Sequence, residues 1–98
     1  MNPIILEAYG STVSARLQAL QWSHLQVTKR GHHLVIYSQD ADGDKVNRAR
    51  FTWRHGQTFT LSLADPRGRW GETGETGSLE ALLTLLIEHF GFLLGDWS

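Results

Sequence analysis

The fold is decided by residues 45–63, which read KVNRARFTWRHGQTFTLSL. Large apolar and polar residues alternate along both halves of this stretch, as they do in strands with one buried face. Two antiparallel strands are therefore predicted, at 45–55 and 58–63. A three-residue loop at 55–57 sets a register that brings the apolar residues together on one face: Trp53 opposite Phe59, Phe51 opposite Leu61, and Ala49 opposite Leu63.

Two further strands are predicted upstream of this hairpin, at 24–30 and 33–39. The Gly31-His32 pair between them, with glycine first, is typical of a type II′ turn and places Val27 opposite Ile36. A turn cluster at 40–44 then leads into the strand that begins at Lys45. We expect a four-stranded meander whose core face carries Val27, Ile36, Phe51, Trp53, Phe59 and Leu61.

Helices are predicted at both ends of the chain. Pro3 suits the first position of a helix over about 3–21, and Gly10 leaves open whether this helix is continuous or broken in two. Ser78 is a good N-cap for a second helix at about 79–90. The apolar face expected for the first helix contains Ile5, Tyr9, Val13, Leu17 and Leu20.

The segment 64–77 contains four glycines and one proline, and a flexible connecting loop is predicted there. Short hairpins make the sheet antiparallel, and a single core then needs both helices on the apolar face. The sequence therefore predicts one domain over residues 1–98, an α+β fold of two layers with the element order α-β-β-β-β-α.

Composition excludes several classes of protein. The chain has 98 residues, no cysteine and a formal net charge of −1, which exclude a disulfide scaffold, a cysteine-ligated metal and a globally basic nucleic-acid binder. No stretch has the pattern of a secretion signal, and the apolar run at 79–94 is interrupted by charged and polar residues. We therefore expect a cytoplasmic protein that does not contact membranes.

Motifs for catalysis or metal binding are weak. Asp40, Asp42 and Asp44 surround a glycine, but an EF-hand loop has its glycine at the sixth position and a carboxylate at the twelfth, where Phe51 stands. His32 and His33 are adjacent, and neighbouring residues of a strand point to opposite faces. The sequence contains neither a nucleophile elbow nor a phosphate-binding glycine loop. We predict no metal, no cofactor and no enzymatic activity.

Charge is distributed unevenly along the chain. All nine lysines and arginines lie between Arg16 and Arg69, where four aspartates oppose them, whereas six carboxylates and no basic residue lie outside. The predicted register places a basic set on the open face, meaning the side of the sheet turned away from the helices. The candidate binding residues there are Arg30, Tyr37, Arg48, Arg50 and Arg54. Such a face can bind phosphates or bases, although solvated sheet faces commonly carry arginine and threonine without any partner.

The C-terminal helix and tail are richer in apolar residues than one packed face requires. Consecutive helical residues differ by about 100° in direction, so Leu85 to Ile87 span roughly 200° of the helix. An exposed apolar remainder marks an interface. The candidate interface residues are Leu85, Ile87, Phe92, Leu93 and Trp97.

These features favour a small non-enzymatic binding or adaptor protein that forms a homodimer. The alternative is a nucleic-acid-binding protein that uses the basic sheet face, and an acidic protein is a further possible partner of the same face.

Overall fold

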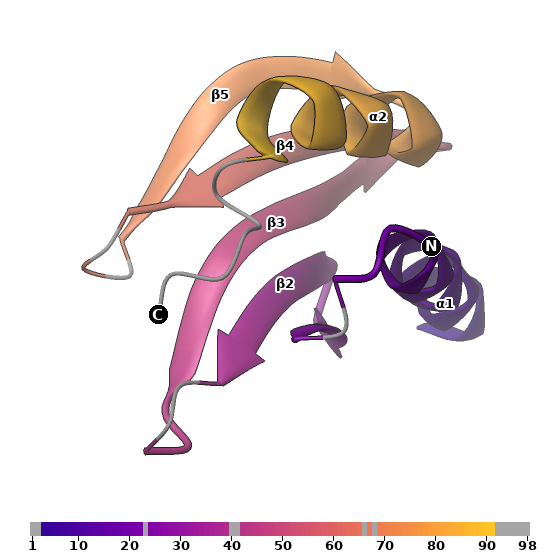
Figure 1. The fold of residues 1–98 in the computed structure, drawn as a ribbon. Helices are drawn as coiled ribbons and strands as arrows, with labels where there is room; N and C mark the ends of the chain where they lie inside the picture. Colours follow the sequence, from indigo (N-terminus) through magenta and orange to yellow (C-terminus); the bar gives the residue numbers. More distant parts are fainter. Residues whose placement is uncertain (1–2, 23, 40–41, 66, 68, 92–98) are drawn as a thin grey trace.

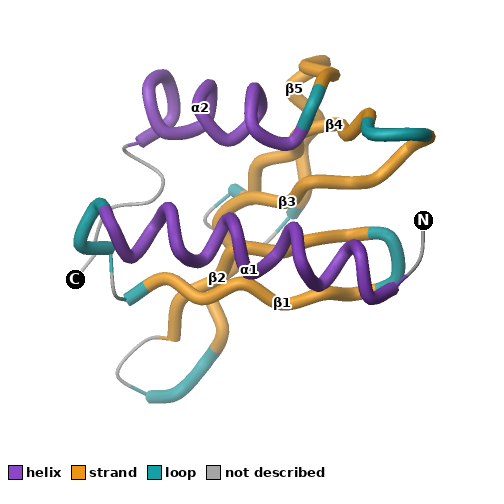
Figure 2. Tube along the Cα trace, turned by 90° about the vertical axis from the view of Figure 1, so that its right-hand side faces the viewer, coloured by secondary structure: helices purple, strands orange, loops and turns teal. Residues whose placement is uncertain are grey.

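The computed structural model describes residues 3–22, 24–39, 42–65, 67 and 69–91. Its elements are helix α1 (Pro3–Ala19), strands β1 (Leu25–Arg30), β2 (His33–Gln39), β3 (Lys45–His55), β4 (Thr58–Ala64) and β5 (Trp70–Gly77), and helix α2 (Leu79–Phe90). The strands form one antiparallel sheet in the order β1-β2-β3-β4-β5 (Figures 1 and 2). The α+β class is confirmed, with five strands in place of the predicted four.

The predicted registers of both hairpins are confirmed. In the β3–β4 hairpin, Phe51 pairs with Leu61 and Ala49 with Leu63, and in the β1–β2 hairpin Val27 pairs with Ile36. Gly31 and Gly56 lie in the two turns with φ of 58° and 55°, a backbone conformation that costs glycine little. Alternation along the strands therefore fixed the pairing, because a one-residue slip would have turned the apolar side chains to the other face.

The prediction of a flexible loop over 64–77 is wrong. Trp70–Gly77 forms β5, which pairs with β4 and is one edge of the sheet. Glycine has low β-propensity, but it supplies the same backbone donors and acceptors as any other residue. Phe59 and Leu61 on β4 are fully buried, so the outer backbone edge of β4 needs hydrogen-bond partners, which β5 provides.

The β4–β5 pairing contains an irregularity that explains the glycine and threonine of β5. Thr60 pairs with Thr76 and Ser62 with Glu72, so residues 73–75 lie opposite Leu61 alone. Thr73 Oγ1 donates a hydrogen bond of 2.9 Å to the Leu61 carbonyl and accepts one of 3.0 Å from the Glu75 amide. Gly74 has a φ of 80°, which a side chain would strain. The bulge thus keeps β5 attached to β4 through a threonine side chain.

Helix α1 is continuous through Gly10 and lies chiefly over β1 (Figure 2). A Cβ atom at Gly10 would lie 3.3 Å from Leu34 Cδ2, so the missing side chain lets the helix approach the sheet closely. The buried face is centred on Leu6, Val13 and Leu17. Ile5 and Leu20, which the sequence places on that face, are about half exposed at 50% and 44%.

The end of α1 lies two residues before the predicted one. The Trp22 amide donates to the Leu17 carbonyl and the Gln21 amide to the Gln18 carbonyl, which is the Schellman pattern of helix termination. Gln21 occupies the left-handed position of this motif with a φ of 64°. The backbone thus turns toward β1 without a glycine.

Helix α2 begins as predicted, because Ser78 Oγ accepts a hydrogen bond of 3.2 Å from the Ala81 amide. It packs on β4 and β5, while Arg16 Nη2 of α1 donates to Thr84 Oγ1 of α2 at 3.4 Å. Both helices therefore lie on the same side of the sheet, as the single-core argument predicts (Figures 1 and 2).

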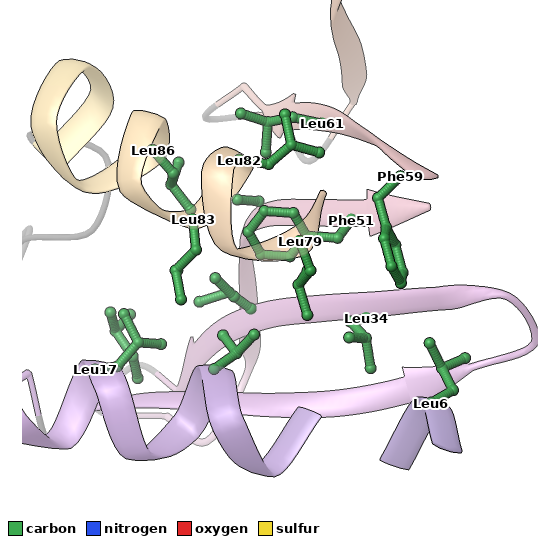
Figure 3. Close-up of a cluster of buried hydrophobic side chains, with 14 residues drawn as sticks. Leu6, Leu17, Leu34, Phe51, Phe59, Leu61, Leu79, Leu82, Leu83 and Leu86 are labelled. Atoms are coloured by element: carbon green, nitrogen blue, oxygen red, sulfur yellow. The ribbon is translucent and has the colours of Figure 1, made fainter. Parts of the chain in front are cut away.

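Between the helices and the sheet lies one apolar core (Figure 3). Of the six predicted sheet residues, four are fully buried and two, Val27 and Trp53, pack against the core while partly exposed. Trp53 Nε1 donates to the Gly56 carbonyl at 2.8 Å, and its ring contacts His32 with 5.3 Å between centroids. Within the described ranges, neither helix combines the length and the apolar character needed to cross a lipid bilayer.

Candidate functional site

A hollow lies on the open face of the sheet, opposite the two helices. Its volume is about 250 Å³, smaller than the 300–1,000 Å³ typical of sites that enclose a whole small molecule. Side chains of β1, β2, β3 and β5 line it, so the sheet itself positions them. The lining residues are Thr28, Arg30, His33, Val35, Tyr37, Lys45, Asn47, Arg50 and Trp70.

The charge of this hollow is positive. Arg30, Lys45 and Arg50 contribute three cations, and none of the nine lining residues is acidic. Within the part of the chain that the structure describes, Arg50 Nε is buried and has no hydrogen-bond partner. A buried donor without an acceptor is unfavourable. Because this nitrogen is closed to solvent, an anion in the hollow would reach it only after the Arg50 side chain moves.

Two aromatic rings in the hollow are each contacted by a cation. Lys45 Nζ lies 4.7 Å from the centroid of the Tyr37 ring, and Arg50 Cζ lies 4.5 Å from the centroid of the Trp70 ring. Both distances are within the range of cation–π attraction. The Tyr37 hydroxyl also donates to Gln26 Oε1 at 3.0 Å. Each ring of the hollow therefore has a cation beside it.

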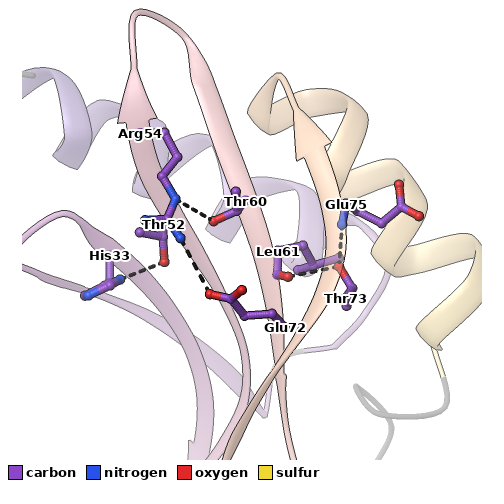
Figure 4. Close-up of polar contacts among 8 residues, drawn as sticks. All are labelled: His33, Thr52, Arg54, Thr60, Leu61, Glu72, Thr73 and Glu75. Atoms are coloured by element: carbon purple, nitrogen blue, oxygen red, sulfur yellow. Dashed lines mark hydrogen bonds and ion pairs between the residues drawn. The ribbon is translucent and has the colours of Figure 1, made fainter.

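His33 also lines the hollow and is partly buried. Its Nδ1 lies 2.8 Å from Thr52 Oγ1 (Figure 4). Burial lowers the pKa of His33 below its usual 6.5, and the positive charges of Arg50, His32 and Arg54 lower this pKa further. His33 is therefore held toward its neutral form, which can donate one hydrogen bond and accept another.

Arg54 lies on the open face beside the hollow and not in its lining. Its Nη2 lies 3.6 Å from Glu72 Oε1 on β5, and its Nε donates to Thr60 Oγ1 at 3.2 Å (Figure 4). Both side chains of this ion pair are about half exposed or more, so the pair contributes little to stability. Of the predicted binding residues, the structure thus brings Arg30, Tyr37 and Arg50 together and leaves Arg54 paired with an acidic residue.

The prediction that Arg48 lies on the open face is wrong. Arg48 is only 4% exposed and donates from Nε and Nη2 to Ser38 Oγ at 3.1 and 2.8 Å. The reason is a bulge between β2 and β3. Ile36 pairs with Ala49 and Tyr37 with Asn47, so Arg48 is an extra residue that interrupts the alternation.

The same bulge explains the lining residues that the sequence analysis missed. Strict alternation places Lys45 and Asn47 on the core face with Ala49, whereas the extra residue turns both to the open face. Trp70 was missed because it belongs to the segment predicted as a loop. The sequence signal for this bulge is the pair Asn47-Arg48: two polar residues in succession reverse the alternation, so Val46 falls out of phase with Ala49.

The candidate interface residues are only partly within the described chain. Leu85 and Ile87 are partly buried and pack against the core. More of the surface of α2 is therefore buried than the sequence predicts. Phe92, Leu93 and Trp97 lie outside the described residues. Among the described residues, the large apolar side chains that are exposed are Ile5 and Leu20, both on α1 or its end.

Metal-ligating side chains do not cluster in the described ranges, where no three histidine or acidic residues converge. Asp40 of the aspartate turn lies outside those ranges.

Comparison with known proteins identifies no relative. The chain matches no protein-family profile, and no curated protein and no solved structure is significantly similar to it.

Proposed function

We propose that this chain is a non-enzymatic binding protein that holds an anionic partner against the open face of its sheet. The observation that carries the proposal is the hollow at the centre of this face. Arg30, Lys45 and Arg50 line it, and no lining residue is acidic. An anion would relieve the mutual repulsion of the three cations.

The distribution of charge on the rest of the molecule supports this orientation. Glu7, Glu80 and Glu88 are exposed on the helices, which cover the opposite side of the sheet. These three carboxylates outnumber the basic residues of the helix side, Arg16 and Lys29. On the open face the basic residues outnumber Glu72, although the formal net charge of the chain is −1. Such a polarity steers an anionic partner toward the open face.

Fluorescence anisotropy with two labelled polyanions, a single-stranded oligonucleotide and polyglutamate, tests the proposal. We expect at least one to bind at about 50 mM salt and to weaken as salt rises. The double variant Arg30→Glu/Lys45→Glu should lose about tenfold or more in affinity, because each substitution places a like charge beside the ligand.

The matched control is Arg67→Glu/Arg69→Glu, which makes the same change of charge at two exposed residues outside the hollow. An equal loss in this control would show a general charge effect in place of a site. Absence of salt-sensitive binding by the unmodified protein to both polyanions would refute the proposal.

Self-association into a homodimer also stays a proposal. Its support is the apolar composition of residues 79–97, although Leu85 and Ile87 contribute part of their surface to the core. Sedimentation equilibrium at tens of micromolar protein decides it. A mass of about twice 11.0 kDa supports a dimer, and a concentration-independent mass near 11.0 kDa refutes it.

A further inference from the structure

We infer that the anionic partner is a single-stranded nucleic acid, with bases stacked at Trp70 and Tyr37 and phosphates neutralised by Arg30, Lys45 and Arg50. This inference rests on the proposed function and names its partner. What carries it is the combination of aromatic rings and cations in one hollow, since a partner that offered carboxylates alone would need only the cations.

Each aromatic ring of the hollow is paired with one cation. The Arg50 guanidinium lies over the Trp70 ring, and a flexible base can stack either on an aromatic ring or on the plane of a guanidinium. Trp70 lies at the start of the edge strand and is partly exposed. Tyr37 and Lys45 form a second such pair, on β2 and β3.

The size of the hollow also favours an extended chain over a small free ligand. A volume of about 250 Å³ is small for a whole ligand, so one unit of a polymer would occupy the hollow while its neighbours lie along the sheet. Four-stranded sheets and β-barrels that bind single-stranded nucleic acids use such an exposed face. Aromatic rings stack with the bases, and basic groups neutralise the phosphate backbone. A duplex keeps its bases stacked inside and cannot reach the rings.

Polar groups for base edges lie in the same lining. Asn47 carries an amide, which can donate to and accept from a base, and Thr28 carries a hydroxyl. His33 is held toward its neutral form and is bonded to Thr52, so it adds a hydrogen-bonding group without a fixed charge.

The deciding experiment measures the affinity of a fluorescein-labelled oligothymidylate, the corresponding duplex and polyglutamate for the full chain. We expect the single strand to bind most tightly. With three phosphate contacts, its affinity should fall about 20-fold between about 50 and 200 mM salt. Arg50→Gln should make the dependence of log affinity on log salt shallower by about 0.7.

The stacking itself is tested by Trp70→Ala, which should weaken single-strand binding by about 5- to 150-fold, the change expected for loss of one stacked base. Trp70→Phe keeps an aromatic ring and should retain most of the affinity. Thermal unfolding of both variants checks that β5 still forms. Polyglutamate has no bases to stack, so its affinity is the control for the loss of the Trp70 ring.

The outcomes separate the two proposals. If polyglutamate binds as tightly as the single strand and Trp70→Ala leaves both affinities within about threefold, the partner is an acidic protein, and only the present inference fails. If the duplex binds more tightly than the single strand, the inference of a single-stranded partner is also refuted. If no polyanion binds, the proposed function fails together with it.

Discussion

Phe51 and Arg50 are neighbours on β3, yet their side chains lie on opposite sides of the sheet and in different surroundings. Phe51 is fully buried between the sheet and the helices, where many apolar residues share the core. Arg50 lies on the open face against the Trp70 ring and lines a hollow. Residues on one face of β3 thus stabilise the fold, and residues on the other face are candidate binding groups. Substitutions can therefore change stability and binding separately.

The largest expected effect is on the core face. Phe51→Ala should lower the free energy of unfolding by about 3–5 kcal/mol, because it removes a fully buried ring and leaves a cavity. Urea denaturation measures this change. Arg50→Ala, one residue away, should cost at most about 1 kcal/mol, because removal of the unpaired buried Nε offsets the lost contact with Trp70. Equal losses in the two variants would show that the two faces do not differ in their contribution to stability.

A second prediction concerns Arg48, the basic residue that the bulge turns away from the open face. Arg48→Ala should cost about 2–3 kcal/mol, because it removes two hydrogen bonds from a buried charged group to Ser38. The control is Arg54→Ala, which removes an exposed arginine of the same strand and should cost at most about 1 kcal/mol. A loss for Arg48→Ala no larger than for Arg54→Ala would contradict its burial.

Trp53 lies on the core face but near its margin, where it is partly exposed. Trp53→Ala should therefore cost about 2 kcal/mol, less than Phe51→Ala, because part of the ring is in water before the change. Denaturation of the two variants under the same conditions gives the comparison. A loss at Trp53 that exceeds the loss at Phe51 would mean that the hairpin end is more closely packed than the structure shows.

The smallest expected effect is the pH dependence of stability that comes from His33 on the open face. Because the pKa of His33 is lowered in the folded chain, the unfolded chain binds more protons below pH 6.5, and the His33 contribution to stability falls as pH falls below that value. His33→Gln should remove the part of the fall in unfolding free energy below pH 6.5 that comes from His33. Denaturation at pH 7.5 and on the acid side of pH 6.5 measures it, with exposed His55 replaced by Gln as the control. An unchanged pH dependence in His33→Gln would contradict the lowered pKa.

Much of the fold could be predicted from local pattern. The apolar–polar alternation of 45–63 set the β3–β4 register, and Ser78 marked the start of α2. The candidate site was predicted less completely: Arg30, Tyr37 and Arg50 meet in the hollow, whereas Lys45, Asn47 and Trp70 were missed. Strict alternation of side chains predicts the face of each residue correctly only until a bulge adds an extra residue to the strand.

By itself, the sequence determined the two helices, four of the strands and the face on which the large apolar residues gather. These properties depend on residues close in the chain, through side-chain periodicity and helix caps. Only the tertiary structure decided that a glycine-rich segment becomes β5 and that Trp70 meets Arg50, twenty positions earlier in the chain. The unpaired backbone edge of β4 requires hydrogen-bond partners whatever side chains the partner carries, and no local pattern records that requirement.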